Sequence, residues 1–212
     1  MMENKNVLVM DNPLITHKMA ILRDEKTSSK EFRELIKEIT MLMCYEVMKD
    51  APTKQVEVKT PLKLMKTSML ENKHMVFVPI LRAGLGMVDG IINMIPTAKF
   101  GHMGFYRDHE TLKPVEYYCK LPSDVEGGDV VLLDPMLATG GTVVDAISML
   151  KKRKPKSIKF MCILASPEGI DKVSKAHPDV KVFCAAKDKG LNENGYILPG
   201  LGDAGDRIFA TV

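Results

Sequence analysis

The chain has 212 residues, of which 45% are hydrophobic, so it can bury a full core without the support of a disulfide or a metal. Its 30 basic and 27 acidic residues nearly balance, which argues against the strongly positive surface of a nucleic-acid-binding protein. No apolar run approaches the length of a membrane-spanning helix, and the charged N-terminal residues fit no signal peptide, so we expect a cytoplasmic protein without a membrane partner.

The length favours a single domain over residues 1–212. The cysteines lie far apart in the sequence and form no CxxC pair, so neither a zinc site nor a disulfide framework is indicated. We therefore expect reduced packing residues at all four positions, which are Cys44, Cys119, Cys162 and Cys184.

The first strong element is a helix that begins near Ser28. Ser28 and Glu31 have the spacing of a capping box, and apolar residues then recur at three- to four-residue intervals as far as Met43. This apolar face predicts a helix in the core or at an interface. Pro52 ends the helical pattern, and Gln55 to Lys59 alternates as a short strand does.

Strands alternate with helices in the rest of the chain. We predict strands at Met75 to Leu81, Phe100 to Tyr106, Asp129 to Leu133, Ile158 to Ala165 and Val180 to Ala185, and helices at Met87 to Ile95, Val143 to Lys152 and Ile170 to His177. Such alternation predicts an α/β fold with a mainly parallel sheet flanked by helices. The polar segment Arg107 to Leu121 is predicted to be a mobile loop or a hairpin, and the glycine-rich tail from Gly195 to Val212 is predicted to form no helix.

The sharpest motif is VVLLDPMLATGGT, from Val130 to Thr142. A buried strand delivers Asp134 at its carboxyl end, where open α/β sheets bind ligands. Backbone N–H groups from Thr139 to Thr142 then lead into a helix, and together they predict a seat for a phosphate monoester. A P-loop would need a lysine that this motif lacks. The alternative is a tight strand-to-helix turn with Asp134 as its cap.

An arginine and a polar loop are two further candidate site elements, and the arginine suits a buried anion of high charge density. Arg82 follows a strand end in PILRAGLGM, and its planar guanidinium suits paired anionic oxygens, although a surface salt bridge would also explain it. Arg107 lies in the polar loop from Tyr106 to Lys120, which can act as a lid that excludes water.

The tail contains a literal GxGxxG from Gly200 to Gly205. A dinucleotide site would need a helix, a second strand and an acidic residue about twenty positions further on. Only seven residues follow Gly205, so we reject that interpretation. Glycines in this segment instead predict a main chain exposed to a small planar ligand.

These motifs together resemble the phosphoribosyltransferases, and in particular the uracil phosphoribosyltransferase family. Most branches begin the sugar-binding signature with two acidic residues, whereas this chain has Leu133 before a single Asp134 and then Pro135, which is similar to the uracil branch. The tail and the N-terminal segments NPLITHK, ILRD and FREL resemble the same branch, and the likeness is weakest between Asp50 and Lys73. The resemblance implies a phosphoribosyltransferase-like fold with an N-terminal helical arm and a small base-binding hood formed by the C-terminal tail.

The resemblance also implies an activity, in which uracil and 5-phosphoribosyl 1-diphosphate give UMP and diphosphate in pyrimidine salvage. Asp134, Arg107 and Asp203 would be catalytic residues, with Asp134 on the ribose hydroxyls and Asp203 a candidate acceptor for the uracil N1 proton. The implied ligands of phosphoribosyl diphosphate are Arg82, Arg107, Asp134, Pro135, Met136, Leu137, Ala138, Thr139, Gly140, Gly141, Thr142 and Asp203. Those of uracil are Ile197, Gly202, Asp203 and Ala204.

The same resemblance implies Mg²⁺ bound mainly through the diphosphate, GTP as an effector as in some relatives, and a homodimer or homotetramer. The helix from Ser28 to Met48 could supply an interface. A non-catalytic regulator of the same fold that binds a nucleotide or RNA is the alternative. It should show a basic surface stripe and lack the tail or the diphosphate arginines, and neither is evident in the sequence. An enzyme for a purine base or orotate is a second alternative, against which the single Asp134 speaks.

Overall fold

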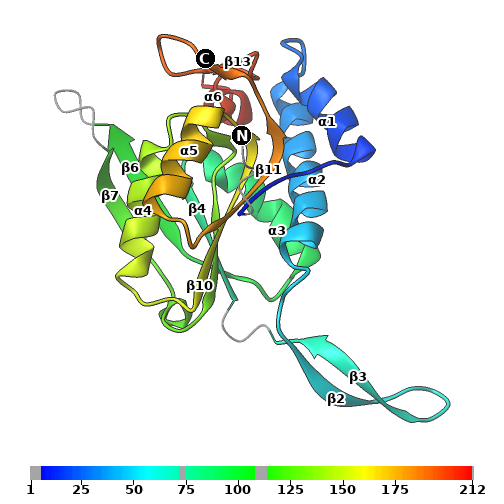
Figure 1. Cartoon of the computed structure of the whole chain (residues 1–212). Helices are drawn as coiled ribbons and strands as arrows, with labels where there is room; N and C mark the ends of the chain where they lie inside the picture. The colour runs from blue at the N-terminus through cyan, green and yellow to red at the C-terminus, as the bar shows by residue number, and fades with distance from the viewer. Residues whose placement is uncertain (1–5, 72–74, 108–113, 212) are drawn as a thin grey trace.

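The computed structural model describes residues 6–71, 75–107 and 114–211. A sheet forms the centre of the fold, and among its described strand pairs only β6 and β7 run antiparallel (Figure 1). Across the sheet the strands are β1 (Val7–Val9), β11 (Lys181–Lys187), β10 (Ser157–Ala165), β8 (Asp129–Leu133), β4 (Met75–Leu81), β6 (His102–Arg107) and β7 (Pro114–Lys120), while β5 (Lys99–Phe100) pairs with β4 and β9 (Met136–Leu137) pairs with β10. The predicted α/β class is confirmed.

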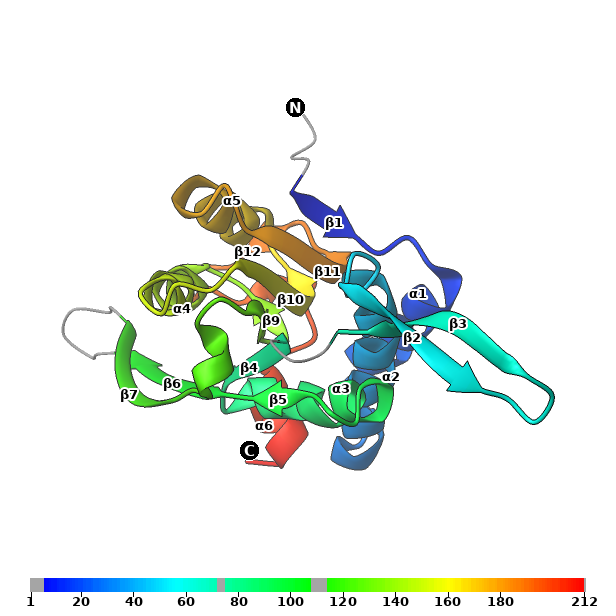
Figure 2. The same ribbon diagram turned by 90° about the horizontal axis from the view of Figure 1, so that it is seen from below.

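Helices cover both faces of the sheet (Figure 2). The helices α1 (Pro13–Arg23), α2 (Ser29–Val47) and α3 (Val88–Met94) lie on one face, and α4 (Gly141–Lys151) and α5 (Pro167–Ala176) lie on the other. Side chains of β8 alternate between the two layers, because successive residues of a strand point to opposite faces. Val131 and Leu133 pack in the α2 layer, whereas Val130 and Leu132 pack in the α4 layer.

Helix α2 begins where its sequence predicts. The Ser28 hydroxyl accepts a hydrogen bond from the N–H of Glu31 at 3.3 Å, and the apolar residues that follow are buried. Phe32, Ile36 and Ile39 all lie in the core of the chain itself. The face that could have supplied an interface is therefore used to cover the sheet.

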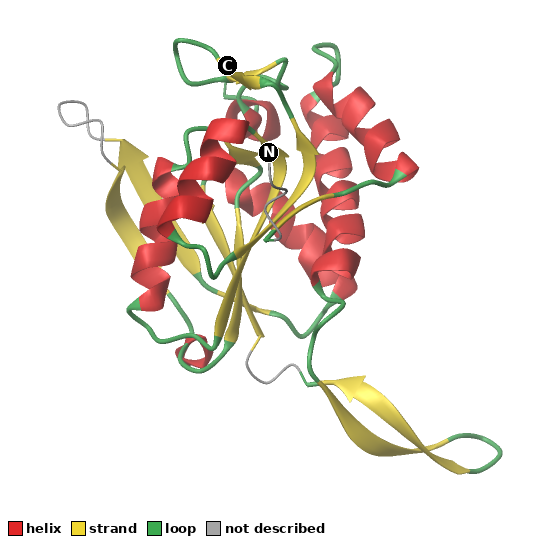
Figure 3. Cartoon of the chain, in the orientation of Figure 1, coloured by secondary structure: helices red, strands yellow, loops and turns green. Residues whose placement is uncertain are grey.

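A hairpin of β2 (Thr53–Lys59) and β3 (Leu64–Leu70) projects away from the body of the molecule (Figure 3). The strand at Gln55 to Lys59 was predicted, but its partner β3 was not. Neither strand contains a buried residue, so the hydrophobic pattern that identifies core strands is weak here. Several apolar side chains of the hairpin face solvent, including Leu62, which is 95% exposed.

The tail contains a helix that the sequence analysis did not predict. Helix α6 (Ala204–Phe209) begins after Asp203, whose carboxylate accepts the N–H of Asp206 at 3.0 Å. Ile208 is buried, and the helix packs against α2 and the 3₁₀ helix η1 (Ala83–Met87). Capping and burial thus outweigh the glycine content that argued against a helix.

Two further expectations concern the polar loop and the cysteines. Of the segment Arg107 to Leu121, which was predicted to be a mobile loop or a hairpin, β7 pairs antiparallel with the preceding strand β6, while residues 108–113 lie outside the described residues. All four cysteines are free, and burial raises the pKa of Cys44 to about 11. No helix in the described part of the chain is long and apolar enough to span a membrane.

Candidate functional site

A cavity of about 390 Å³ opens where the C-terminal tail meets the carboxyl end of β8. Residues from two separate motifs line it together with Ala83 of η1, which follows Arg82. Of the residues predicted from the sequence, those in the cavity wall are Asp134, Met136, Ala138, Ile197, Gly202, Asp203 and Ala204. The structure therefore brings the aspartate motif and the tail together around one space.

The loop after β8 leaves a row of backbone donors unpaired. Gly140 has a φ of 75° and stands before the first turn of α4, and no side chain caps that helix. In the described part of the chain, the N–H groups of Thr139, Gly140, Gly141 and Thr142 have no hydrogen-bond acceptor. Unpaired N–H groups at the N-terminus of an 11-residue helix favour an anion.

The neighbouring helix α5 supports this loop from behind. A side chain at Gly169 would meet the carbonyl oxygen of Ala138 at 2.4 Å, so only glycine allows the two backbones to lie so close. Pro135 and Leu137, which were predicted among the sugar ligands, are buried and do not line the cavity. The Pro135 carbonyl accepts the N–H of Ile163 at 3.0 Å and joins the loop to β10.

Replacing Gly140 by alanine is expected to weaken sugar binding. The alanine would have to keep the left-handed backbone conformation of Gly140, and its methyl group would meet the Gly169 carbonyl oxygen at 3.0 Å. We therefore also expect the free energy of unfolding to fall by about 1–2 kcal/mol. Gly127→Ala is the matched control, because Gly127 has a φ of 70° and open space around it. Melting temperature and the KM for the sugar should be measured for both variants. Equal KM values for the sugar in the two variants would show that Gly140 is not part of the phosphate seat.

Asp134 is the most perturbed carboxyl group in the cavity. It receives the N–H of Met136 at 3.3 Å, and the protein surrounds it closely although part of the side chain faces the cavity. Burial raises the pKa of Asp134 to about 7, the hydrogen bond from Met136 opposes this rise, and the negative charge of Asp203 adds to it. A cation or a set of hydroxyl donors in the cavity would favour the ionised form.

The tail offers its main chain to the same cavity. In the described part of the chain, the N–H groups of Gly202, Ala204 and Gly205 have no hydrogen-bond acceptor. Asp203 lies between them, and one of its carboxylate oxygens is engaged in capping α6. These donors can pair with the carbonyl oxygens of a small planar ligand.

Arg82, one of the two predicted arginines, does not line the cavity. Arg82 is 61% exposed, with its Nη2 atom 3.7 Å from Oδ1 of Asp206 and its guanidinium 6.0 Å from the centre of the Phe209 ring. It would have to turn away from α6 to meet a ligand. Arg107 ends β6, and its side chain lies outside the described residues, so its role stays a prediction.

The family model of uracil phosphoribosyltransferase matches residues 9–211. The chain belongs to the uracil phosphoribosyltransferase family. It is 59% identical over 205 residues to a uracil phosphoribosyltransferase from Clostridium beijerinckii, covering 97% of this chain and 98% of that protein. Nothing in these comparisons supports the non-catalytic regulator.

Solved structures agree with the fold of this family. The AQ2163 protein from Aquifex aeolicus is 40% identical, with a TM-score of 0.92 over 97% of this chain and 98% of that one. A hypoxanthine-guanine phosphoribosyltransferase from Bacillus anthracis is 14% identical, with a TM-score of 0.51 over 76% of this chain and 80% of that one, and shares the fold alone.

Sequence reasoning assigned no role to Arg23, Asp188 and Arg207. The structure shows that Arg23 and Asp188 form an ion pair across 165 positions of the sequence and bind Gly200 of the tail, and that Arg207, within the tail, binds Leu22 of α1 and Leu201. The signals were the ILRD segment of the uracil phosphoribosyltransferase resemblance, which contains Arg23, and the tail segment of the same resemblance, which ends at Arg207. No spacing rule connects them to Asp188.

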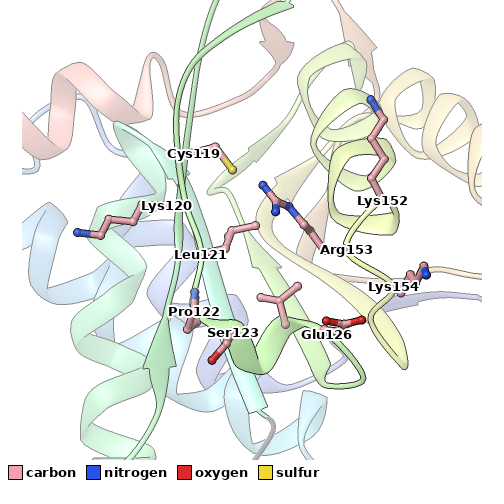
Figure 4. A pocket seen from close by; sticks show the side chains of 10 residues that line it. Cys119, Lys120, Leu121, Pro122, Ser123, Glu126, Lys152, Arg153 and Lys154 are labelled. Carbon is pink, nitrogen blue, oxygen red and sulfur yellow. The ribbon is translucent and has the colours of Figure 1, made fainter.

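A second hollow of about 590 Å³ lies between the end of β7 and the C-terminal end of α4, away from the motifs of the uracil phosphoribosyltransferase family. Four basic residues line it, but in Figure 4 only Arg153 points into the space, while Lys120 and Lys154 point away. Its charges therefore do not converge on one point as those of a phosphate site would.

Proposed function

We propose that this chain transfers the phosphoribosyl group of 5-phosphoribosyl 1-diphosphate to N1 of uracil, giving UMP and diphosphate in pyrimidine salvage. The observation that carries the proposal is one cavity shared by Asp134, from the sugar motif, and the unpaired main chain of the tail. In this reaction the bond from C1 to the diphosphate oxygen breaks, a bond from C1 to N1 forms, and the N1 proton leaves.

The 5′-phosphate is assigned to the loop from Ala138 to Thr142. Its unpaired N–H groups and the N-terminus of α4 supply positive potential, and two threonine hydroxyls add donors. Seating the phosphate there places the ribose towards Asp134, at the carboxyl end of β8. Pro135, Met136 and Leu137 shape this loop, with Met136 in the cavity wall.

Asp134 and Asp203 act on the reacting sugar. Positive charge develops on the ribose ring as the diphosphate leaves, and an ionised Asp134 that accepts the ribose hydroxyls would stabilise that charge. Asp203 lines the same cavity as Asp134 and is the candidate to receive the N1 proton. Arg82 would contact the diphosphate after its side chain turns away from α6, and Arg107 is proposed as the second arginine on the diphosphate.

The donor set also fits Mg²⁺. The cavity presents the carboxylates of Asp134 and Asp203, which are hard oxygen donors. No three His, Cys, Asp or Glu residues gather in a possible metal site among the described residues. Bound mainly through diphosphate oxygens, Mg²⁺ would supply positive charge beside the leaving group.

Assembly and regulation extend the proposal. We assign the homodimer or homotetramer contact to the β2–β3 hairpin, whose exposed apolar residues Leu62, Leu64 and Met69 need a partner surface. Light scattering of the chain and of a Leu62→Asp/Leu64→Asp variant would test this.

GTP as an effector rests on the sequence resemblance, and rates of UMP formation with and without GTP would test it.

The activity itself is tested by mixing the purified protein with uracil, 5-phosphoribosyl 1-diphosphate and Mg²⁺. We expect UMP and diphosphate in equal amounts, measured by chromatography. Hypoxanthine and orotate in place of uracil are the controls, and product with either of them but none with uracil would refute the proposal.

A further inference from the structure

The tail segment from Ile197 to Ala204, called the base loop below, is held at Gly200 by a pair of charged residues. Arg23 and Asp188 form a bidentate ion pair, with Nη2 to Oδ1 at 2.6 Å and Nη1 to Oδ2 at 2.8 Å. The same two groups bind both polar atoms of Gly200. Its N–H donates to Oδ2 of Asp188 at 2.8 Å, and its carbonyl oxygen accepts from Nη1 of Arg23 at 2.7 Å.

Gly200 lies at a bend between two parts of the cavity wall. Its φ is 72°, and an added Cβ would meet the carbonyl oxygen of Ile197 at 2.1 Å, so only glycine fits. Ile197 before the bend and Gly202 after it both line the cavity, whereas Gly200 does not. The orientation of the Gly200 peptide groups therefore determines how the backbone on each side enters the cavity.

The ion pair is well placed to resist rotation of this bend. The side chain of Asp188 is 6% exposed and that of Arg23 is 25% exposed, so water competes little for their hydrogen bonds. Burial alone would raise the pKa of Asp188, but the hydrogen bonds from Arg23 and from the Gly200 amide outweigh it and lower the pKa. Asp188 thus stays ionised through the neutral range.

We infer that Arg23 and Asp188 are positioning residues for the base: they fix the Gly200 peptide groups and so direct the unpaired N–H groups of Gly202 and Ala204 into the cavity. Neither residue lines the cavity, so both act through the main chain. This inference rests on the proposed function, in which those N–H groups bind uracil. It predicts different effects on the two substrates, because among the described residues no hydrogen bond or ion pair joins the loop from Ala138 to Thr142 to Arg23 or Asp188.

The test compares Asp188→Asn, Arg23→Lys and the double variant. We expect kcat/KM for uracil to fall on the order of 10- to 100-fold through a higher KM for uracil, while the KM for the sugar changes less than about twofold. Asp188→Glu, which keeps the charge, should recover part of the loss. Effects in the double variant should be smaller than the product of the single ones, because the two residues act as a unit.

Lys18→Gln is the matched control, because it breaks another ion pair of α1, Lys18 to Glu38 at 2.5 Å, that does not touch the tail. Its KM for uracil should stay unchanged. Equal rises in both KM values, or an unchanged KM for uracil in Arg23→Lys, would overturn the inference. If Asp188→Asn does not fold, Arg23→Lys decides alone. A wild-type protein that makes no UMP would instead refute the proposed function.

Discussion

Cytosine is expected to be used about 10⁴- to 10⁵-fold less efficiently than uracil. Uracil presents a carbonyl oxygen, an N–H and a second carbonyl oxygen along one edge. The unpaired N–H groups of Gly202 and Ala204 are donors that suit carbonyl oxygens. Cytosine places an amino group where uracil has O4, so a donor would face a donor, and its unprotonated N3 would leave a second group unpaired in the cavity.

Catalytic efficiencies with the two bases, measured at one sugar concentration, check this expectation. Ile197→Val and Ala204→Ser serve as companion variants, and both should lose rate with uracil without gaining use of cytosine, because peptide groups and not side chains discriminate. Comparable efficiencies for cytosine and uracil in the wild-type protein would show that the tail does not read the base through its main chain.

Replacing Asp134 by asparagine is expected to lower kcat by about 10²- to 10³-fold and yet to stabilise the protein at alkaline pH. The activity falls because asparagine brings no negative charge to the ribose. The wild-type kcat/KM for the sugar should rise with pH through about 7, where the free enzyme's Asp134 ionises.

The stability effect follows from the pKa of about 7 in the folded protein. Since an unfolded aspartate titrates near about 3.9, folding favours the protonated carboxyl group. The stability that this group contributes is fully present below about pH 4 and is lost as the pH rises through about 7. Asparagine cannot ionise, so the stability of the variant does not fall in this way over that pH range.

Melting temperatures of Asp134→Asn and of the wild-type protein should therefore diverge as the pH rises, with the variant higher at about pH 8. Asp171→Asn controls for the loss of a negative charge, because Asp171 is an exposed residue of α5 paired with Lys175. A difference in melting temperature that is independent of pH would mean that Asp134 titrates normally.

The elements that bear on the phosphate seat could be predicted because their signals are local. An apolar run ending in Asp134 predicts a buried strand with a ligand at its carboxyl end, and the structure has β8 there. The following glycines indicate a turn into a helix, and Gly140 has the positive φ that such a turn requires. Each inference needs only residues within about one turn of one another.

Long-range contacts explain what the sequence did not reveal. Helix α6 depends on Ile208, which packs against distant α2, so local composition could not predict it. The Arg23–Asp188 pair joins positions 165 residues apart and has no local pattern. Strand β3 was missed because both faces of its hairpin lie outside the core. The position of the Arg82 side chain likewise depends on α6.

The base loop depends on contacts between segments far apart in the sequence, whereas the phosphate seat is built from the loop after β8 and the helices α4 and α5 that follow it. Arg207 donates to the carbonyl oxygens of Leu22 and Leu201, and so joins α1 to the tail across 185 positions. During synthesis on the ribosome, α1 emerges long before Arg207, so the contact between them forms late. A nascent chain can thus complete its phosphate seat once α5 has emerged, whereas the base loop closes only after Arg207 has left the exit tunnel.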